Sequence, residues 1–149
     1  DKFSDYSDFI KYFGVSGLEG ISQNFKTDFW VWEDFANSAA KIGNLEALDW
    51  LSNMNPPVFP NKRGLFQALK AKNYNVIKWY ITWAPNRMLN PTNVLIFNSK
   101  VADFAAKNGR LDVLKLLASE QSVYPTTQGA NWTLAIDRSD ILKWMSRLN

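Results

Sequence analysis

Residues 39–51 read AAKIGNLEALDWL, and residues 105–117 read AAKNGRLDVLKLL. In both stretches a segment of small residues ends at a Gly and is followed by apolar residues at helical spacing. Gly tolerates the left-handed backbone that ends many helices, and apolar residues three and four positions apart form one face of a helix. Each stretch therefore predicts the end of one helix, a tight turn and a second helix.

A five-residue pattern extends this arrangement along the chain. Two apolar residues, one charged residue and two large apolar residues occur in this order at 9–13, 47–51, 76–80, 113–117 and 141–145. Successive copies begin 38, 29, 37 and 28 positions apart. Each of the last four copies follows a segment of smaller residues, which we interpret as the first helix of a pair. Self-similarity at such a period is typical of repeat architectures, and the alternating spacing indicates an insertion in every second linker.

We therefore predict an all-α fold, a short α-solenoid of about four to five helix–turn–helix units with irregular linkers. The chain is expected to form a single domain over 1–149. Its units are expected at 35–60, 61–98, 99–127 and 128–149, after a degenerate N-terminal unit at 1–34. Prolines mark the linkers, and a short extra helix could run from Pro91 to Phe97.

The two opening stretches resemble the ankyrin repeat. In that family two Ala close the first helix, a Gly ends it, and branched apolar residues followed by Leu-Leu mark the second helix. The match is weaker where Lys72 and Asp137 stand at the Gly position, and the family's Thr-Pro-Leu-His opening is absent. The chain is thus similar to a divergent ankyrin-repeat protein over residues 35–145. A helical-hairpin solenoid near the tetratricopeptide class is the structural alternative, although its spaced Gly, Tyr and Pro are not present.

Residue types exclude much enzyme chemistry. The chain contains no Cys and no His, so it lacks a thiolate nucleophile, the commonest general base and the commonest metal ligand. We therefore expect no catalytic residue, no cofactor and no metal site, although an enzyme that relies on carboxylates alone stays possible in principle. No apolar stretch approaches the roughly 20 residues that cross a bilayer, so we expect no transmembrane segment. The cellular compartment is left open.

Function is expected to be binding. The resemblance to ankyrin repeats implies a non-enzymatic scaffold, and a solenoid exposes an extended surface on which a partner can lie. The first hypothesis is a protein–protein interaction scaffold or a structural subunit of a larger assembly. Its candidate contact residues are Trp30 and Trp32, because Trp is enriched at interface hot spots. On a helix the two rings point to roughly opposite sides, so one of them is expected to be partly exposed unless both pack inside.

The alternative hypothesis is a nucleic-acid-binding protein. Residues 50–102 contain no acid and seven bases, although the whole chain carries a net charge of only +3. Such a basic block can attract an anionic partner, and binding to nucleic acid would weaken steeply with salt. A solvated face without a partner is the simpler interpretation. The candidate contact residues in this block are Arg63, Lys70, Lys72 and Lys100.

Overall fold

A computed structural model describes residues 4–148, and within this range it forms nine α-helices, one short 3-10 helix and no strand. The all-α prediction is therefore confirmed for the described part of the chain. The chain divides into two compact units, Asp1–Leu95 and Ile96–Asn149. The single-domain organisation predicted for residues 1–149 stays a prediction.

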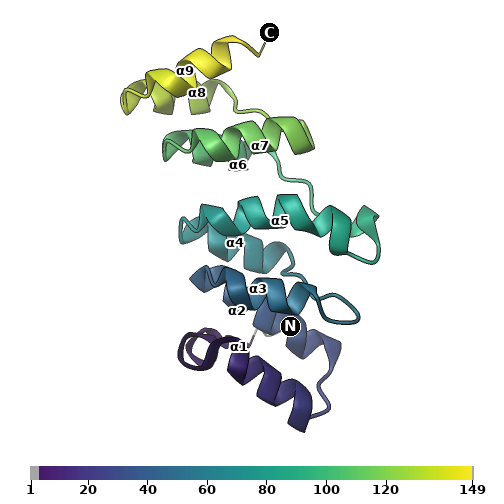
Figure 1. Cartoon of the computed structure of the whole chain (residues 1–149). Helices are drawn as coiled ribbons and strands as arrows, with labels where there is room; N and C mark the ends of the chain where they lie inside the picture. Colours follow the sequence, from purple (N-terminus) through teal and green to yellow (C-terminus); the bar gives the residue numbers. More distant parts are fainter. Residues whose placement is uncertain (1–3, 149) are drawn as a thin grey trace. The chain divides into compact units, whose positions relative to one another are not determined.

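The first unit contains α1, whose helical backbone is interrupted by a kink at Gly14, and two helix–turn–helix pairs (Figure 1). Its helices are α1 (Ser7–Asn24), α2 (Phe29–Ile42), α3 (Leu45–Ser52), α4 (Lys62–Lys70), α5 (Tyr74–Arg87) and the 3-10 helix η1 (Pro91–Asn93). Within the pairs α2 packs on α3 and α4 packs on α5, and between the pairs α2 packs on α4 and α3 contacts α5. The first helices of the pairs therefore lie side by side, and so do the second helices. Helix α1 packs against α2 and α3.

The second unit contains two further pairs. Its helices are α6 (Ser99–Lys107), α7 (Leu111–Gln121), α8 (Thr127–Ala135) and α9 (Ser139–Ser146). Helix α6 packs on α7, α8 packs on α9, and the two first helices α6 and α8 pack on each other. In both units the later apolar pentads lie on the second helices of the pairs, where Leu48, Ile77, Leu114 and Ile141 are completely buried.

All four pairs turn in the same way. In each pair, one residue in the turn after the first helix has a positive φ. The angle is 76° at Gly43, 62° at Lys72, 69° at Gly109 and 55° at Asp137. The next backbone N–H then donates to a carbonyl five residues earlier, at 2.8 to 3.2 Å. This left-handed turn satisfies carbonyls that the end of a helix leaves without an intrahelical partner. Lys72 and Asp137 thus adopt a backbone conformation that Gly adopts more easily.

A buried polar side chain joins the first helices of neighbouring pairs. In the first unit the Oδ1 atom of Asn37 on α2 accepts the backbone N–H of Asn61, the N-cap of α4, at 2.9 Å. In the second unit Asp103 on α6 accepts the backbone N–H of Thr126, the N-cap of α8, at 2.6 Å. Both side chains are buried, with 1% and 6% exposure. The same contact is thus built twice, from residues six positions before the left-handed turn in each case.

The helices at this contact approach too closely for a side chain on one of them. A Cβ atom at Gly64 of α4 would lie 2.3 Å from Oδ1 of Asn37 and 2.7 Å from its Cα. A Cβ atom at Gly129 of α8 would lie 2.4 Å from Oδ1 of Asp103. Real Cβ atoms do not come so close to other atoms. We call the contact between α2 and α4, and that between α6 and α8, a seam. Each seam requires a Gly opposite its buried polar residue.

Three local features differ from the sequence-based expectations. Helix α2 begins at Phe29, before the expected start at Phe35, because the apolar run after the extended Asp28 is helical and buries Trp32. The extra helix expected from Pro91 to Phe97 is only the 3-10 turn of η1, since the chain leaves it in extended conformation at Val94. In the first pentad Ile10 is buried but Tyr12 and Phe13 are exposed, so only part of that pentad contributes to the core.

Replacement of Gly64 by Ala tests the close approach of α2 and α4. Ala normally stabilises a helix position by about 0.5–1 kcal/mol relative to Gly. At Gly64 we expect the opposite, a loss of about 1–3 kcal/mol in the free energy of unfolding, because the new methyl group overpacks against the Asn37 backbone. Urea unfolding measures the change. The control is Gly20→Ala in α1, where no atom lies within 4 Å and Ala should stabilise; equal effects at both sites would contradict the packing described.

Replacement of Lys72 by Gly tests the left-handed turn. Gly relieves the cost of a positive φ, which is about 1 kcal/mol for a residue with a Cβ, so we expect a small rise in the midpoint of thermal unfolding. Lys70→Gly, two residues earlier and inside α4, should lower the midpoint because Gly is unfavourable within a helix. A stabilising effect of both substitutions, or of neither, would be inconsistent with this turn.

Candidate partner-binding site

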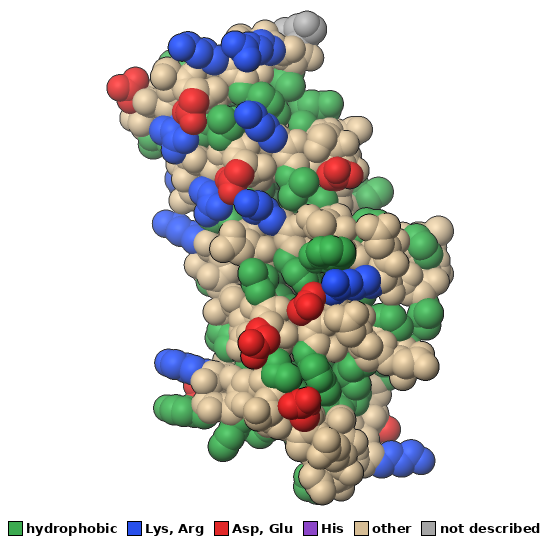
Figure 2. All heavy atoms as spheres, in the orientation of Figure 1, with side chains coloured by type: hydrophobic (Ala, Val, Ile, Leu, Met, Phe, Trp, Pro, Cys, Tyr) green, Lys and Arg blue, Asp and Glu red, His purple; other side chains and the backbone are tan. Residues whose placement is uncertain are grey.

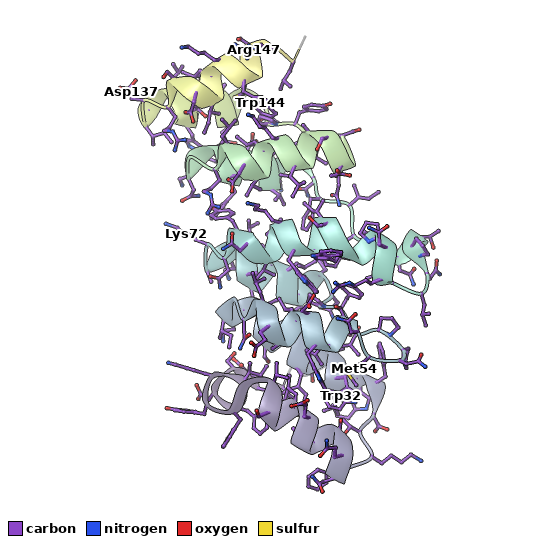
Figure 3. The ribbon with its side chains drawn as sticks, in the orientation of Figure 1. Trp32, Met54, Lys72, Asp137, Trp144 and Arg147 are labelled. Carbon is purple, nitrogen blue, oxygen red and sulfur yellow. The ribbon has the colours of Figure 1, made fainter. Side chains whose placement is uncertain are left out.

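The two candidate Trp residues have different environments. Trp30 lies in the first turn of α2 and is 60% exposed. Trp32, which is labelled in Figure 3, is 6% exposed. Its ring centroid lies 5.6 Å from that of Phe35 and 6.0 Å from that of Trp50. The structure therefore places Trp32 in the core, where it supports α2 and α3, and leaves Trp30 as the ring that a partner can reach.

A pocket of about 430 Å³ opens in the first unit near the start of α2, and we call it the α2 pocket. Four parts of the first unit build it: the start of α2, the loop between α3 and α4, Tyr80 of α5, and the segment that follows α5. Phe29, the residue before Trp30, belongs to one wall. The lining is mainly aromatic, aliphatic and proline side chains with a few amides: Phe29, Glu33, Pro56, Pro57, Phe59, Pro60, Asn61, Tyr80, Met88, Leu89, Asn90, Asn93 and Leu95.

Contacts with buried rings hold the walls in place. Phe59 of the α3–α4 loop packs on Trp79 and Tyr80 of α5, with centroid distances of 5.5 and 6.2 Å. The hydroxyl of Tyr80 accepts the backbone N–H of Leu95 at 2.9 Å, which fixes the segment after α5. On the third wall Nδ2 of Asn61 donates to Oε1 of Glu33 at 2.9 Å. The α2 pocket thus has walls that exist before any ligand binds.

Arg87 anchors the end of α5 next to the pocket. Its Nη1 atom donates to Oδ1 of Asp49 at 2.5 Å and to Oγ of Ser52 at 2.8 Å, both on α3. Its guanidinium lies 4.3 Å from the ring centroid of Trp83. The hydrogen bond from Arg87 holds the pKa of the Asp49 carboxyl below its usual value, and this effect outweighs desolvation. Basic and acidic side chains meet over α3 and α5 in Figure 2. The chain reaches the pocket lining directly after this anchor.

The chemistry of the lining favours binding over proton transfer. Among the described residues that line the α2 pocket, Glu33 is the one carboxylate, and it is engaged by the Asn61 amide. Burial raises the pKa of the Tyr80 phenol, so this group stays protonated at neutral pH. An apolar pocket with a few fixed polar groups can take an apolar side chain and orient the chain that carries it.

The four candidate basic residues belong to two different units of the chain. Arg63 and Lys70 are exposed on α4, and Lys72 projects from the turn between α4 and α5 (Figure 3). Lys100 is exposed in the first turn of α6 and belongs to the second unit. The first unit therefore brings three of the four bases onto α4 and its turn.

Two surface residues escaped the sequence-based prediction. Lys62 and Phe66 are exposed on α4 together with Lys70. The four-residue spacing of Lys62, Phe66 and Lys70 places them on one face of the helix, and this signal was present in the sequence. The pocket residues offered no such local signal, because their walls come from segments far apart in the chain.

No protein-family model, curated protein or solved structure matches the chain. No helix in residues 4–148 combines the length and apolar character that a bilayer crossing needs. Within the same range no three acidic side chains gather closely enough to hold a metal ion. The geometry of the α2 pocket and of α4 therefore carries the functional argument.

The anchor between Arg87 and Asp49 predicts a measurable titration. The pKa of Asp49 is lower in the folded chain than in the unfolded chain, so the ionised carboxylate stabilises the fold. This stabilisation is fully present above the pKa of the unfolded chain, about 4, and is lost as the pH falls through the lowered pKa of the folded chain. The pair is partly exposed, so we expect it to contribute less than about 1 kcal/mol.

An NMR titration of the Asp49 side-chain carboxyl carbon measures this pKa directly. We expect Arg87→Gln to raise it toward its usual value, whereas Lys11→Gln, a change at an exposed base on α1, should leave it unchanged. A pKa of Asp49 that does not respond to the loss of Arg87 would show that the anchor is absent in solution.

Proposed function

We propose that the chain is a short array of ankyrin-like helix–turn–helix units that binds another protein, as an interaction scaffold or as a structural subunit of a larger assembly. The likeness of the four turns supports the repeat assignment, since each has a positive φ at the equivalent residue and the same backbone hydrogen bond after it. The likeness of the two Gly-lined seams supports it independently. Repeats that bury their apolar faces against their neighbours leave loops and outer helix faces for partners.

The observation that carries the binding proposal is the α2 pocket. Its volume of about 430 Å³ is large enough for a bulky side chain, and its lining is largely apolar. The half-exposed ring of Phe29 forms part of the wall, and the exposed ring of Trp30 follows it in the chain. Exposed aromatic rings next to a pocket are typical of interface hot spots. In this proposal an apolar side chain of the partner enters the pocket, and the amides of Asn90 and Asn93 bind its backbone.

Residue chemistry supports a partner protein over a substrate. The chain has no His or Cys, and the pocket offers a single engaged carboxylate and a protonated phenol. General acid–base catalysis needs a group whose pKa lies near the working pH and within reach of the reacting atom. Binding energy from apolar burial needs no such group.

Affinity capture with surface variants tests this function. The immobilised chain should recover one dominant protein from native extract of the source cells, also after nuclease treatment. We expect Trp30→Ala, and separately Leu89→Asp at the pocket wall, to reduce this recovery by about tenfold or more, because hot-spot side chains carry much of an interface's free energy.

The matched control is Tyr12→Ala on α1, which removes an aromatic ring that is even more exposed than that of Trp30, at 77%. Circular dichroism of each variant checks that the fold is retained. Equal recovery by Trp30→Ala, Leu89→Asp and Tyr12→Ala would contradict the proposed site. Failure to recover any protein reproducibly would contradict the proposed function itself.

A further inference from the structure

Two loop segments that lead into first helices share a sequence pattern. Residues 58–64 read VFPNKRG, and residues 123–129 read VYPTTQG. Each has a Val, an aromatic residue, a Pro, the N-cap of a helix and, three residues after the N-cap, the Gly of the seam. We call this pattern an entry segment. Within its own unit, each entry segment packs on the helix pair that precedes it in the chain.

The preceding pair holds the entry segment with two acceptors. Its first helix supplies the buried polar residue of the seam, which accepts the N–H of the N-cap. Its second helix supplies a backbone carbonyl. In the first unit the carbonyl of Leu51 accepts the N–H of Val58 at 3.0 Å, and in the second unit the carbonyl of Leu117 accepts that of Val123 at 3.1 Å. Each carbonyl belongs to the residue eight positions after the left-handed residue of the turn.

The pair of α8 and α9 carries both acceptors at the same positions. Asn131 stands six positions before the left-handed Asp137 (Figure 3), and Met145 stands eight positions after it. The carbonyl of Met145 accepts the N–H of Leu148 at 3.1 Å. A carbonyl oxygen has two lone pairs, and the carbonyl of Leu51 accepts an N–H of its own helix end as well as that of an entry segment. The Met145 carbonyl therefore has room for a second donor.

The side chains next to these acceptors are uncovered. Asn131 is exposed, whereas the equivalent residues of both seams are buried. Leu134 is 62% exposed, although Ala40 and Ala106 at the equivalent position, three residues before the turn, are completely buried. The surface that closes a seam on α2 and α6 is thus open on α8. We call Asn131, Leu134 and Met145 the α8–α9 site.

A pocket of about 520 Å³ adjoins the α8–α9 site. Its lining includes Tyr124 and Pro125 before α8, Ala130 on α8, and Met145 and Leu148 at the end of α9. In each seam the buried Val of the entry segment lies at the equivalent carbonyl. The pocket therefore offers space at the place where an entry segment inserts its Val.

The α8–α9 site lies on the side of α8 that is turned away from α6. Gly129 of α8 meets Asp103 of α6, and Asn131 follows two residues later, which is about 200° further around the helix. The link from the first unit, at Ile96, leads into α6 and not into α8 or α9. The open face is therefore opposite the helix at which the chain enters the second unit.

We propose that the α8–α9 site binds an entry segment of a partner protein. This segment has Val, an aromatic residue, Pro and a polar N-cap at the start of a helix, with Gly three residues after the N-cap. The N–H of the N-cap donates to the side-chain oxygen of Asn131, and the N–H of the Val donates to the carbonyl of Met145. The Val side chain enters the pocket, and the helix of the partner covers Leu134.

The occupant is a partner and not a second copy of this chain. Both entry segments in the described part of the chain are already bound in their own seams, so a second copy has none to offer without unfolding. The inference rests on the proposed function for the class of partner and names the segment that binds. The α2 pocket is a separate contact in the other unit.

An NMR titration of the full chain, labelled with ¹⁵N, tests the inference. The probe is a blocked peptide with the sequence of residues 57–71, PVFPNKRGLFQALKA, which contains one entry segment and the helix after it. We expect the amide signals of Asn131, Leu134 and Met145 to shift in a saturable manner, with a dissociation constant at or below about 1 mM. The signals of Trp30 in the other unit should stay in place.

A second peptide carries Ala in place of the Gly that follows the N-cap. Ala favours a helix more than Gly does, so this peptide is at least as helical and has the same charge. We nevertheless expect it to bind about tenfold more weakly or less, because its methyl group overpacks against α8 as a Cβ at Gly64 would against Asn37.

Matched variants of the chain locate the binding. Asn131→Ala should weaken the peptide by about tenfold, because it removes the acceptor of the N-cap N–H. Asn131→Asp should retain binding, since Asp103 performs this role in the seam of the second unit. The control Asn75→Ala removes an exposed amide from α5 and should change nothing. Circular dichroism checks that each variant is folded.

Three results would overturn the inference. Equal affinity of the Gly and Ala peptides, or of Asn131→Ala and Asn75→Ala, would show that the contact is not built like a seam. Shifts at the α8–α9 site that grow with chain concentration without peptide, together with a dimer in sedimentation, would assign the site to a second copy. No saturable shift there at about 3 mM peptide would remove the site. None of these results bears on the capture experiment with Trp30 and Leu89 variants, so the two proposals fail separately.

Discussion

One kind of hydrogen bond defines how the helix pairs within each unit meet. A buried side-chain oxygen on the first helix of one pair, from Asn37 or Asp103, accepts the backbone N–H at which the next first helix begins. A helix start has several N–H groups without intrahelical partners, so this contact satisfies a group that would otherwise need water. It also draws the helices together until only Gly fits at positions 64 and 129. The packing of α2 on α4 and of α6 on α8 depends on this approach.

The surfaces available for binding follow from that packing. Close contact between α2 and α4 fixes Asn61, and Asn61 in turn holds Glu33 and contributes to the pocket wall. A change that loosens the seam is expected to disturb the α2 pocket first, because the pocket uses the loop that leads into α4.

Local pattern predicted the helices and their turns, but not the pocket. Gly43 and Gly109 marked the left-handed positions directly, and the repeat spacing extended them to Lys72 and Asp137. Helical periodicity also separated Trp30 from Trp32, yet it could not say which ring is buried, since that depends on contacts with Trp50 on the following helix. The start of α2 was missed because the recurring small-residue pattern begins only at Phe35, although Asp28 is a residue type that often caps a helix. The pocket was missed because its walls meet only through tertiary contacts.

Amide hydrogen exchange at Asn61 and Thr126 tests the central contact most directly. The backbone N–H of an N-cap has no partner within its own helix, so slow exchange there requires an acceptor from elsewhere. The account predicts exchange at both residues about a hundredfold or more below the unprotected rate, with Asn37→Ala abolishing the protection at Asn61 and sparing Thr126 in the other unit. Exchange of both amides at the unprotected rate in the unaltered chain would contradict it.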